Sequence, residues 1–469
     1  MSPSACRLWR LDQAANLAQQ RRCYTTTWDM IAIGNKMSDP ALLTPLAEGE
    51  VKEPARPRLR DVMGPGLITG ASDDDPSGIA TYSQAGAQLG YSIGWVLLIT
   101  YPLMCAIQQI AATIGRVTGQ GLAGNMRKHA PIWLLQCLVA LLLLANVINI
   151  GADLGAMAAA LNLLLPGPRL LYVAMFAVAT VLLEVFVRYS RYVIVLRWLC
   201  LSLFAYVGTV FVVGVPWSQV ALGLVMPSIT WSSDYLTLVV AILGTTISPY
   251  LFFWQAGQEV EDEREDPNAR PLLRSPSQAP QALARIRLDT YVGMAFSNLI
   301  ALFIVITTAA TLNAHGVTDI QTSSQAAEAL RPIAGRFAFT IFALGIVGTG
   351  LLALPVLAGS AAYAVGEAFQ WRVGLSRRPK RAKEFYVTIA VATLAGAVLN
   401  FTPLDPVKAL IWSAVVNGVV AVPVMFMMML LASRRAVMGE FTLGPVLKAV
   451  GWVSTAVMLL ASVAMFATM

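Results

Sequence analysis

The chain has 469 residues, of which 57% are hydrophobic and only 13% are charged, and its mean hydropathy is +0.65. These values exclude an ordinary soluble domain and indicate an integral membrane protein. The formal net charge of +7 fits loops that contact lipid headgroups, so no nucleic-acid partner is expected.

Residues 1–57 differ in composition from the rest of the chain. Four arginines lie within the first 22 residues, but no hydrophobic stretch follows them, so a secretory signal is not expected. A targeting peptide is one interpretation of this tail. A disordered leader or a mis-assigned start, with Met37 available, fits its composition better. The transporter domain is predicted to cover residues 58–469.

Eleven hydrophobic stretches long enough to cross a bilayer follow the tail, which predicts an all-α integral membrane protein with about eleven transmembrane helices. The predicted spans are residues 62–88, 92–116, 132–163, 169–187, 192–214, 235–257, 288–311, 336–358, 385–400, 405–432 and 445–467.

Lys and Arg residues concentrate in alternate loops, whereas opposite loops such as residues 216–233 nearly lack them. The positive-inside rule then places the N-terminus in the cytoplasm and, with an odd number of spans, the C-terminus outside. We expect a multi-pass protein whose default location is a bacterial plasma membrane. Its partners would be the lipid bilayer and a small substrate, because no obligate protein partner is evident.

The first span contains Asp73-Asp74-Asp75-Pro76-Ser77-Gly78. A carboxylate at membrane depth costs several kcal/mol, so it indicates function. Pro76 interrupts the helical hydrogen bonds, and the freed carbonyl groups need partners inside the protein. A carboxylate beside free carbonyl oxygens predicts a site for a hard cation.

The sixth span is also broken by a proline, Pro249. Two proline-broken spans that lie five spans apart predict an inverted 5+5 repeat with the substrate site between the two breaks. Repeat one would cover about 62–214, repeat two about 235–432, and an extra helix about 445–467.

Several motifs resemble the NRAMP family of divalent-metal transporters. They include Gly64-Pro-Gly-Leu-Ile, Asp75-Pro-Ser-Gly, Ala80-Thr-Tyr, Gly90-Tyr, Met438-Gly-Glu-Phe441 and the broken sixth span, and the resemblance covers about 58–469. It implies a LeuT-type fold with broken helices 1 and 6.

The chain departs from the main NRAMP branch at the implied metal site. Gly78 stands where the family has an Asn ligand, and Ser248 stands where it has a thioether ligand; the family's carbonyl ligand corresponds to Thr245. With Asp75, these positions imply an oxygen-rich site suited to Mg²⁺, which keeps part of its water shell. The pattern resembles the NRAMP-related magnesium transporter branch.

Further residues could lie around the directly bound ligands: Asp73, Asp74, Ser77, Tyr250 and Asp153. Asp73 and Asp74 could hold the ion's water shell, or they could line a vestibule or cap the broken helix.

The proton relay of the family is also altered. Asp153 matches one carboxylate of a pair in the third span, but Ala156 replaces the other. Tyr250 and Gln255 occupy two positions where the sixth span of the family has histidines. Because neither titrates near neutrality as histidine does, the resemblance implies transport without proton coupling.

The favoured function is therefore a secondary transporter that imports hydrated Mg²⁺, with Mn²⁺ also accepted, and needs no cofactor. A proton-coupled Mn²⁺/Fe²⁺ importer, an amino-acid symporter on the same fold and a non-transporting receptor remain alternatives. No Cys/His cluster or nucleophile elbow indicates an enzyme. The acidic run at residues 259–266 is interpreted as a solvated loop, and the four methionines within residues 425–429 as packing residues.

Overall fold

The computed structural model describes residues 69–70, 72–187, 201–402 and 405–469, and these ranges contain helices and turns but no β-strand. The predicted tail 1–57 and the start of the first span lie outside the described residues.

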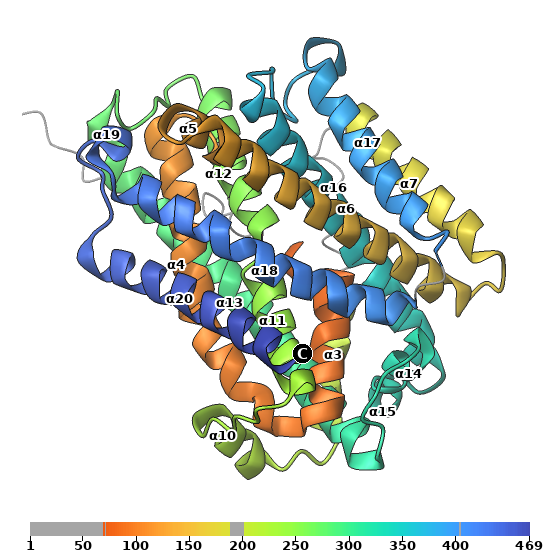
Figure 1. Ribbon diagram of the computed structural model, residues 1–469. Coiled ribbons are helices and arrows are strands. Elements are labelled where there is room, and N and C mark those ends of the chain that lie inside the picture. The colour runs from red at the N-terminus through yellow and green to blue at the C-terminus, as the bar shows by residue number, and fades with distance from the viewer. Residues whose placement is uncertain (1–68, 71, 188–200, 403–404) are drawn as a thin grey trace, which may run out of the picture. The chain divides into compact units, whose positions relative to one another are not determined.

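Figure 1 shows the arrangement of the helices in the described ranges. Those of the first half are α3 (Pro76–Leu89), α4 (Gly94–Thr118), α5 (Leu122–His129), α6 (Ile132–Asn162), α7 (Arg169–Phe186), α9 (Phe204–Val212) and α10 (Trp217–Val225). The later ones are α11 (Ser233–Thr246), α12 (Pro249–Glu265), α13 (Ala279–Thr311), α14 (Ser323–Glu328), α15 (Arg331–Ala334), α16 (Ala338–Ala368), α17 (Lys383–Leu399), α18 (Pro406–Ser433), α19 (Arg435–Met438) and α20 (Pro445–Thr468).

Within the described ranges, eight helical segments are long and apolar enough to cross a membrane, or nine if the bent pair α9 and α10 counts as one span. One of the eight, Pro76–Thr118, combines the first two predicted spans, and the chain reverses direction between α3 and α4 (Figure 1). Gly90 permits this reversal because its φ of +61° lies in the left-handed region. The short predicted span 385–400 corresponds to α17, whereas the predicted span 192–214 is only partly described.

Two sequence-based expectations were wrong. Part of the loop predicted at residues 216–233 is the helix α10, which follows α9 after a bend of 117°. The acidic run 259–266 is not a solvated loop, because α12 continues to Glu265 and buries both Glu259 and Glu261.

Both predicted helix breaks are present. In the first span, residues 72–73 are helical, Asp74 and Asp75 are not, and α3 starts at Pro76. In the sixth span, α11 ends at Thr246 and α12 starts at Pro249. Each proline occupies the first position of a helix, where its missing N–H costs nothing. The breaks therefore divide each span into two half-helices.

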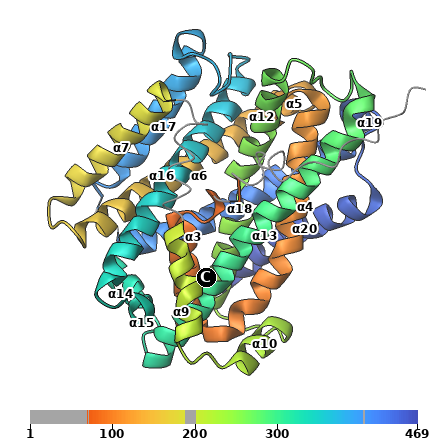
Figure 2. The same ribbon diagram turned by 180° about the vertical axis from the view of Figure 1, so that it is seen from behind.

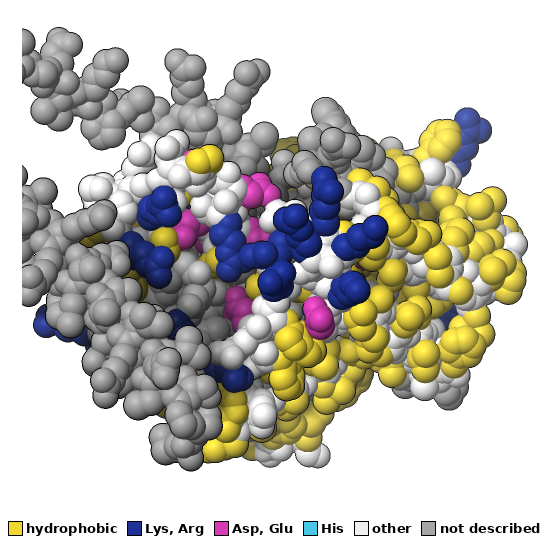
Figure 3. All heavy atoms as spheres, turned by 90° about the horizontal axis from the view of Figure 1, so that it is seen from above, with side chains coloured by type: hydrophobic (Ala, Val, Ile, Leu, Met, Phe, Trp, Pro, Cys, Tyr) yellow, Lys and Arg dark blue, Asp and Glu magenta, His cyan; other side chains and the backbone are white. Residues whose placement is uncertain are grey.

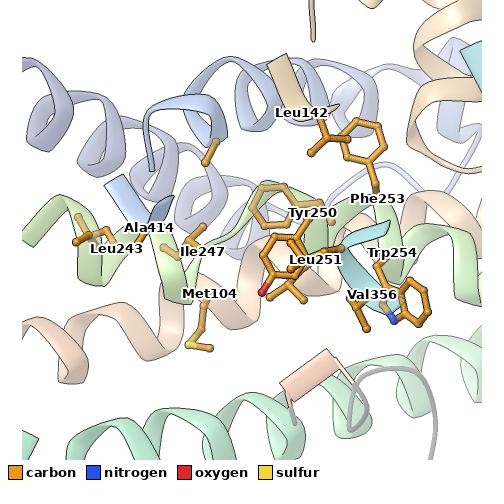
Figure 4. Close-up of a cluster of buried hydrophobic side chains, with 14 of the residues drawn as sticks. Met104, Leu142, Leu243, Ile247, Tyr250, Leu251, Phe253, Trp254, Val356 and Ala414 are labelled. Atoms are coloured by element: carbon orange, nitrogen blue, oxygen red, sulfur yellow. The ribbon is translucent and has the colours of Figure 1, made fainter. Parts of the chain in front are cut away.

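Tight packing fixes the half-helices. A Cβ atom on Gly115 of α4 would lie 2.4 Å from the carbonyl oxygen of Ala256 in α12, so only glycine allows these helices to approach so closely. Arg116 of α4 forms an ion pair with Glu263 of α12 at 3.0 Å. Figure 4 shows Phe253 of α12 beside Leu142 of α6, and further along α12 the side chain of Trp254. Elsewhere α9 packs along α13 (Figure 2).

We expect Gly244→Ala to destabilise the protein by about 1–3 kcal/mol, because an added methyl group would overpack a helix contact. The new Cβ in α11 would lie 2.1 Å from the Ala414 carbonyl oxygen and 2.5 Å from the Gly418 nitrogen of α18. Both are backbone atoms that cannot move aside alone. Chemical unfolding in detergent measures the effect, and Gly214→Ala is the control because its Cβ meets no atom within 4 Å. Equal stability of the two variants would contradict the prediction.

The charged side chains gather at one end of the bundle. Figure 3 shows Lys and Arg side chains on that end face beside a large hydrophobic flank. At this end α5 and α19 lie near one another, whereas α10, α14 and α15 lie at the opposite end (Figure 1). The asymmetry agrees with the distribution of charge used to predict topology.

Candidate functional site

Asp75 sits at the centre of the first break, and its side chain is 1% exposed. It is the N-cap of α3, where its Oδ1 atom accepts a hydrogen bond of 2.7 Å from the N–H of Gly78. Asp is a preferred N-cap because its carboxylate satisfies a free N–H and faces the positive end of the helix. Because Asp75 is the N-cap of α3, the prediction that Asp73 or Asp74 could cap the broken helix is wrong.

The second carboxylate oxygen of Asp75 faces two other helices. Asn149 of α6 donates a hydrogen bond of 3.1 Å to Oδ2, and the Tyr250 hydroxyl of α12 donates one of 3.3 Å to the same atom. Tyr250 lies in the first turn of α12, directly after the second break. One carboxylate thus joins both broken spans and α6.

Gly78 brings the first break close to the end of α11. A Cβ at this position would lie 3.0 Å from Thr245 Oγ1 and 3.3 Å from the carbonyl oxygen of Asp73, so a larger side chain would fill the space between the half-helices. The Ser248 hydroxyl donates to the carbonyl oxygens of Gly244 at 2.6 Å and Thr245 at 2.8 Å. The Thr245 carbonyl oxygen, which the resemblance implies as an ion ligand, therefore accepts a hydrogen bond from Ser248, the other implied ligand of this break.

The other residues of the first break point toward different helices. Ser297 of α13 donates a hydrogen bond to Asp73 at 2.6 Å and has a longer contact of 3.3 Å with Asp74. The Ser77 hydroxyl contacts α18, at 3.0 Å from the Leu410 carbonyl oxygen and 3.2 Å from Ser413 Oγ. All three side chains are buried. Asp73 and Asp74 connect the first break to α13, and Ser77 connects it to α18, whereas Asp75 contacts α6 and α12.

Asp153 is buried in α6, one helical turn after Asn149 and close enough to Asp75 for electrostatic interaction. Asn149 and Ser297 were not predicted from the sequence. A signal for Asn149 existed, because Asn146, Asn149 and Asp153 recur at helical spacing along one face of an apolar span. Asn146 on this face donates to the Leu357 carbonyl oxygen of α16 at 2.8 Å.

The Asp75 carboxylate is contacted by a backbone N–H, a side-chain amide and a hydroxyl, and the buried carboxylates of Asp73, Asp74 and Asp153 lie within electrostatic range of it. The described part of the chain contains no group of three or more His, Cys, Asp or Glu residues that could hold a metal ion together. A small hard cation that keeps several waters needs only one or two carboxylates, and this donor set fits it.

Comparison with known proteins identifies the family. Residues 66–468 match the model of the Nramp family, described as natural resistance-associated macrophage protein-like. The chain belongs to the Nramp family. This assignment confirms the resemblance to the NRAMP family, and it makes the chain a membrane transporter and not an enzyme. It does not distinguish the magnesium transporter branch from the main branch.

Bacterial relatives of this Nramp protein align over most of its length. The divalent metal cation transporter MntH of Aeromonas hydrophila is 27% identical over 426 residues, which cover 88% of this chain and 95% of the relative. The protein of the same name from Klebsiella pneumoniae is 26% identical over 411 residues, covering 84% and 91% of the two chains.

Solved structures support the fold. A crystal structure of the manganese transporter of Eremococcus coleocola has a TM-score of 0.65, with 19% identity and 89% of each chain covered. MhsT in complex with L-phenylalanine has a TM-score of 0.55, with 14% identity and coverage of 86% of this chain and 97% of MhsT. The predicted LeuT-type fold of an all-helical membrane transporter is thereby confirmed.

Proposed function

We propose that this Nramp protein imports hydrated Mg²⁺ into the cytoplasm, also accepts Mn²⁺, and moves no protons with the metal. The proposal places it in the magnesium-transporting branch of the family. Family membership supports a divalent metal cation as substrate over an amino acid or a receptor role, because the bacterial relatives are named divalent metal cation transporters.

The observation that carries the proposal is the chemistry around Asp75. We assign direct or water-mediated metal contacts to Asp75, Thr245 and Ser248, and we assign room for the ion's water to Gly78. Oxygen ligands suit Mg²⁺ and Mn²⁺, whereas a thioether at position 248 would favour softer ions. The Ser248 hydroxyl donates to the carbonyl oxygens of Gly244 and Thr245, which supports a group of oxygen atoms at the second break.

The residues in place of the family's histidines support uncoupled transport. Tyr250 is a hydrogen-bond donor to Asp75, and Gln255 accepts a hydrogen bond from the Thr69 hydroxyl. Both therefore have a structural partner, and neither gains or loses a proton near neutral pH. A doubly charged ion that moves inward through 100 mV gains roughly twice 2.3 kcal/mol, which can drive import without protons.

We also assign the protein to a bacterial plasma membrane with its N-terminus in the cytoplasm. The Lys- and Arg-rich end face of Figure 3 would then be cytoplasmic, in agreement with the positive-inside rule.

Uptake into proteoliposomes tests the proposal, with one dye for the metal and a second for lumenal pH. We expect Mg²⁺ and Mn²⁺ to enter under an inside-negative potential while the lumenal pH stays constant. Acidification that accompanies Mn²⁺ uptake, together with no Mg²⁺ uptake, would replace the proposal with the proton-coupled Mn²⁺/Fe²⁺ importer. An ionophore that collapses the potential is the control, and it should slow uptake.

A further inference from the structure

A hollow of about 410 Å³ opens in the loop between α16 and α17. Its lining consists of Ser376, Arg377, Arg378 and Arg381. Three arginine residues therefore line one cavity, just before the start of α17.

The loop carries positive charge without any acidic residue of its own, and the nearby Glu261 carboxylate of α12 is bound to its backbone N–H groups. Residues 370–383 contain six Lys or Arg residues and no Asp or Glu. In the part of the chain that the structure describes, none of the three cavity arginines forms an ion pair with a carboxylate. An anion that enters the hollow would meet a concentrated positive potential.

Hydrogen bonds hold the backbone of the loop in place. The Glu261 carboxylate of α12 accepts from the N–H groups of Leu375 at 2.6 Å and Ser376 at 3.0 Å. Tyr386 of α17 donates from its hydroxyl to the carbonyl oxygens of Leu375 at 3.2 Å and Arg377 at 3.0 Å. The arginines thus project from a fixed scaffold, which lowers the entropy cost of binding.

The hollow lies where a lipid headgroup would reach it. Phe369 and Trp371, just before it, stack with ring centroids 5.2 Å apart, and their side chains are 56% and 38% exposed. Val387 and Val391 of α17 are each 59% exposed on the flank below. Exposed aromatic residues between a basic surface and an apolar flank are typical of the membrane interface. Figure 3 shows that Lys and Arg side chains on one end face of the molecule border a hydrophobic flank.

We infer that this hollow binds the phosphate group of an anionic lipid headgroup. The planar forks of arginine match phosphate oxygens in geometry as well as charge, and the Ser376 hydroxyl adds a further donor. Basic pockets at the cytoplasmic side of membrane helices are suited to such headgroups. Soluble phosphate shares this chemistry, but it would gain nothing from the aromatic pair or the apolar flank. The inference does not depend on which metal the protein carries.

The test titrates the purified full chain in a neutral detergent with short-chain phosphatidylglycerol and follows complex formation by native mass spectrometry. Short-chain phosphatidylcholine and inorganic phosphate form the two comparison arms. The double variant Arg378→Gln/Arg381→Gln leaves Arg377, which donates from Nε to the Val373 carbonyl oxygen at 3.0 Å, in place. Arg434→Gln/Arg435→Gln removes the same charge at the start of α19 and is the matched control.

We expect phosphatidylglycerol to bind at least ten-fold more tightly than phosphatidylcholine. The Arg378/Arg381 variant should lose this preference, and the Arg434/Arg435 variant should keep it within two-fold. Equal loss in both variants would show a general charge effect and overturn the inference. If millimolar inorganic phosphate displaces the lipid, the hollow binds phosphate itself and the inference of a lipid ligand is wrong. Gel filtration verifies that both variants are folded. All four substituted arginines are exposed, so we expect their replacement to leave the core packing unchanged.

Discussion

Asp75→Asn is expected to reduce Mg²⁺ and Mn²⁺ uptake by at least about 100-fold, which corresponds to ~2.7 kcal/mol of lost ion stabilisation. The carboxylate of Asp75 supplies the fixed negative charge at the break, and its partners Asn149, Tyr250 and the Gly78 N–H are all uncharged. A divalent cation held by Asp75 therefore loses the counter-charge that these hydrogen bonds orient, and the neighbouring carboxylates Asp73, Asp74 and Asp153 do not take over its position.

The substitution should leave the fold intact, because asparagine is as good an N-cap as aspartate and can still accept from the Gly78 N–H. Uptake in proteoliposomes and thermal unfolding in detergent separate the loss of transport from a loss of folding. Asp234→Asn is the control, since it makes the same chemical change at an exposed position in the first turn of α11. If Asp75→Asn keeps more than a tenth of the unmodified uptake rate, Asp75 is not a ligand of the transported metal.

Ser248→Met is expected to reverse the metal preference. Mg²⁺ uptake should fall at least about ten-fold, and Cd²⁺ should become a transported ion, because a thioether prefers soft cations and binds hard ones poorly. The change also removes the hydroxyl that donates to the carbonyl oxygens of Gly244 and Thr245. Both effects act at the second break, where the proposed ligands of α11 lie.

Ser248→Ala separates these two effects, since it deletes the hydroxyl without adding sulfur. We expect Ser248→Ala to weaken Mg²⁺ uptake without creating Cd²⁺ uptake. Competition between Mg²⁺ and Cd²⁺ in the same vesicles measures the preference directly. If Ser248→Met transports Mg²⁺ normally and excludes Cd²⁺, residue 248 does not contact the ion and the oxygen-site proposal fails.

The helix breaks could be predicted from the sequence because their cause is local. A proline lacks an N–H and cannot continue the helix that precedes it, so Pro76 and Pro249 mark the starts of α3 and α12 wherever the rest of the chain lies. The burial of Asp75 followed for a similar reason, since the apolar residues on both sides of it indicated a membrane span.

The partners of these residues could not be predicted, because they come from distant parts of the chain. Asn149 is 74 residues from Asp75, and Tyr250 is 175 residues away. The burial of the acidic run at residues 259–266 could not be predicted for the same reason. Glu259 is buried against Arg285, and Glu261 accepts from an N–H that lies 114 residues later. Charge alone indicated solvent, whereas tertiary contacts supplied specific donors.

The close contact between α4 and α12 limits how the protein can move. Besides the Gly115 contact and the Arg116–Glu263 ion pair, Arg116 donates to the Arg270 carbonyl oxygen at 2.6 Å, which fastens the segment after α12 to the same end of α4. These contacts couple α4 to α12, so we expect the two helices to move together. If α12 moves when the Asp75 break opens, we expect α4 to move with it and the backbone to bend at Ile247 and Ser248, which lie between α11 and α12. Ser248, which is proposed to select the ion, would then also lie at the bend through which the site opens.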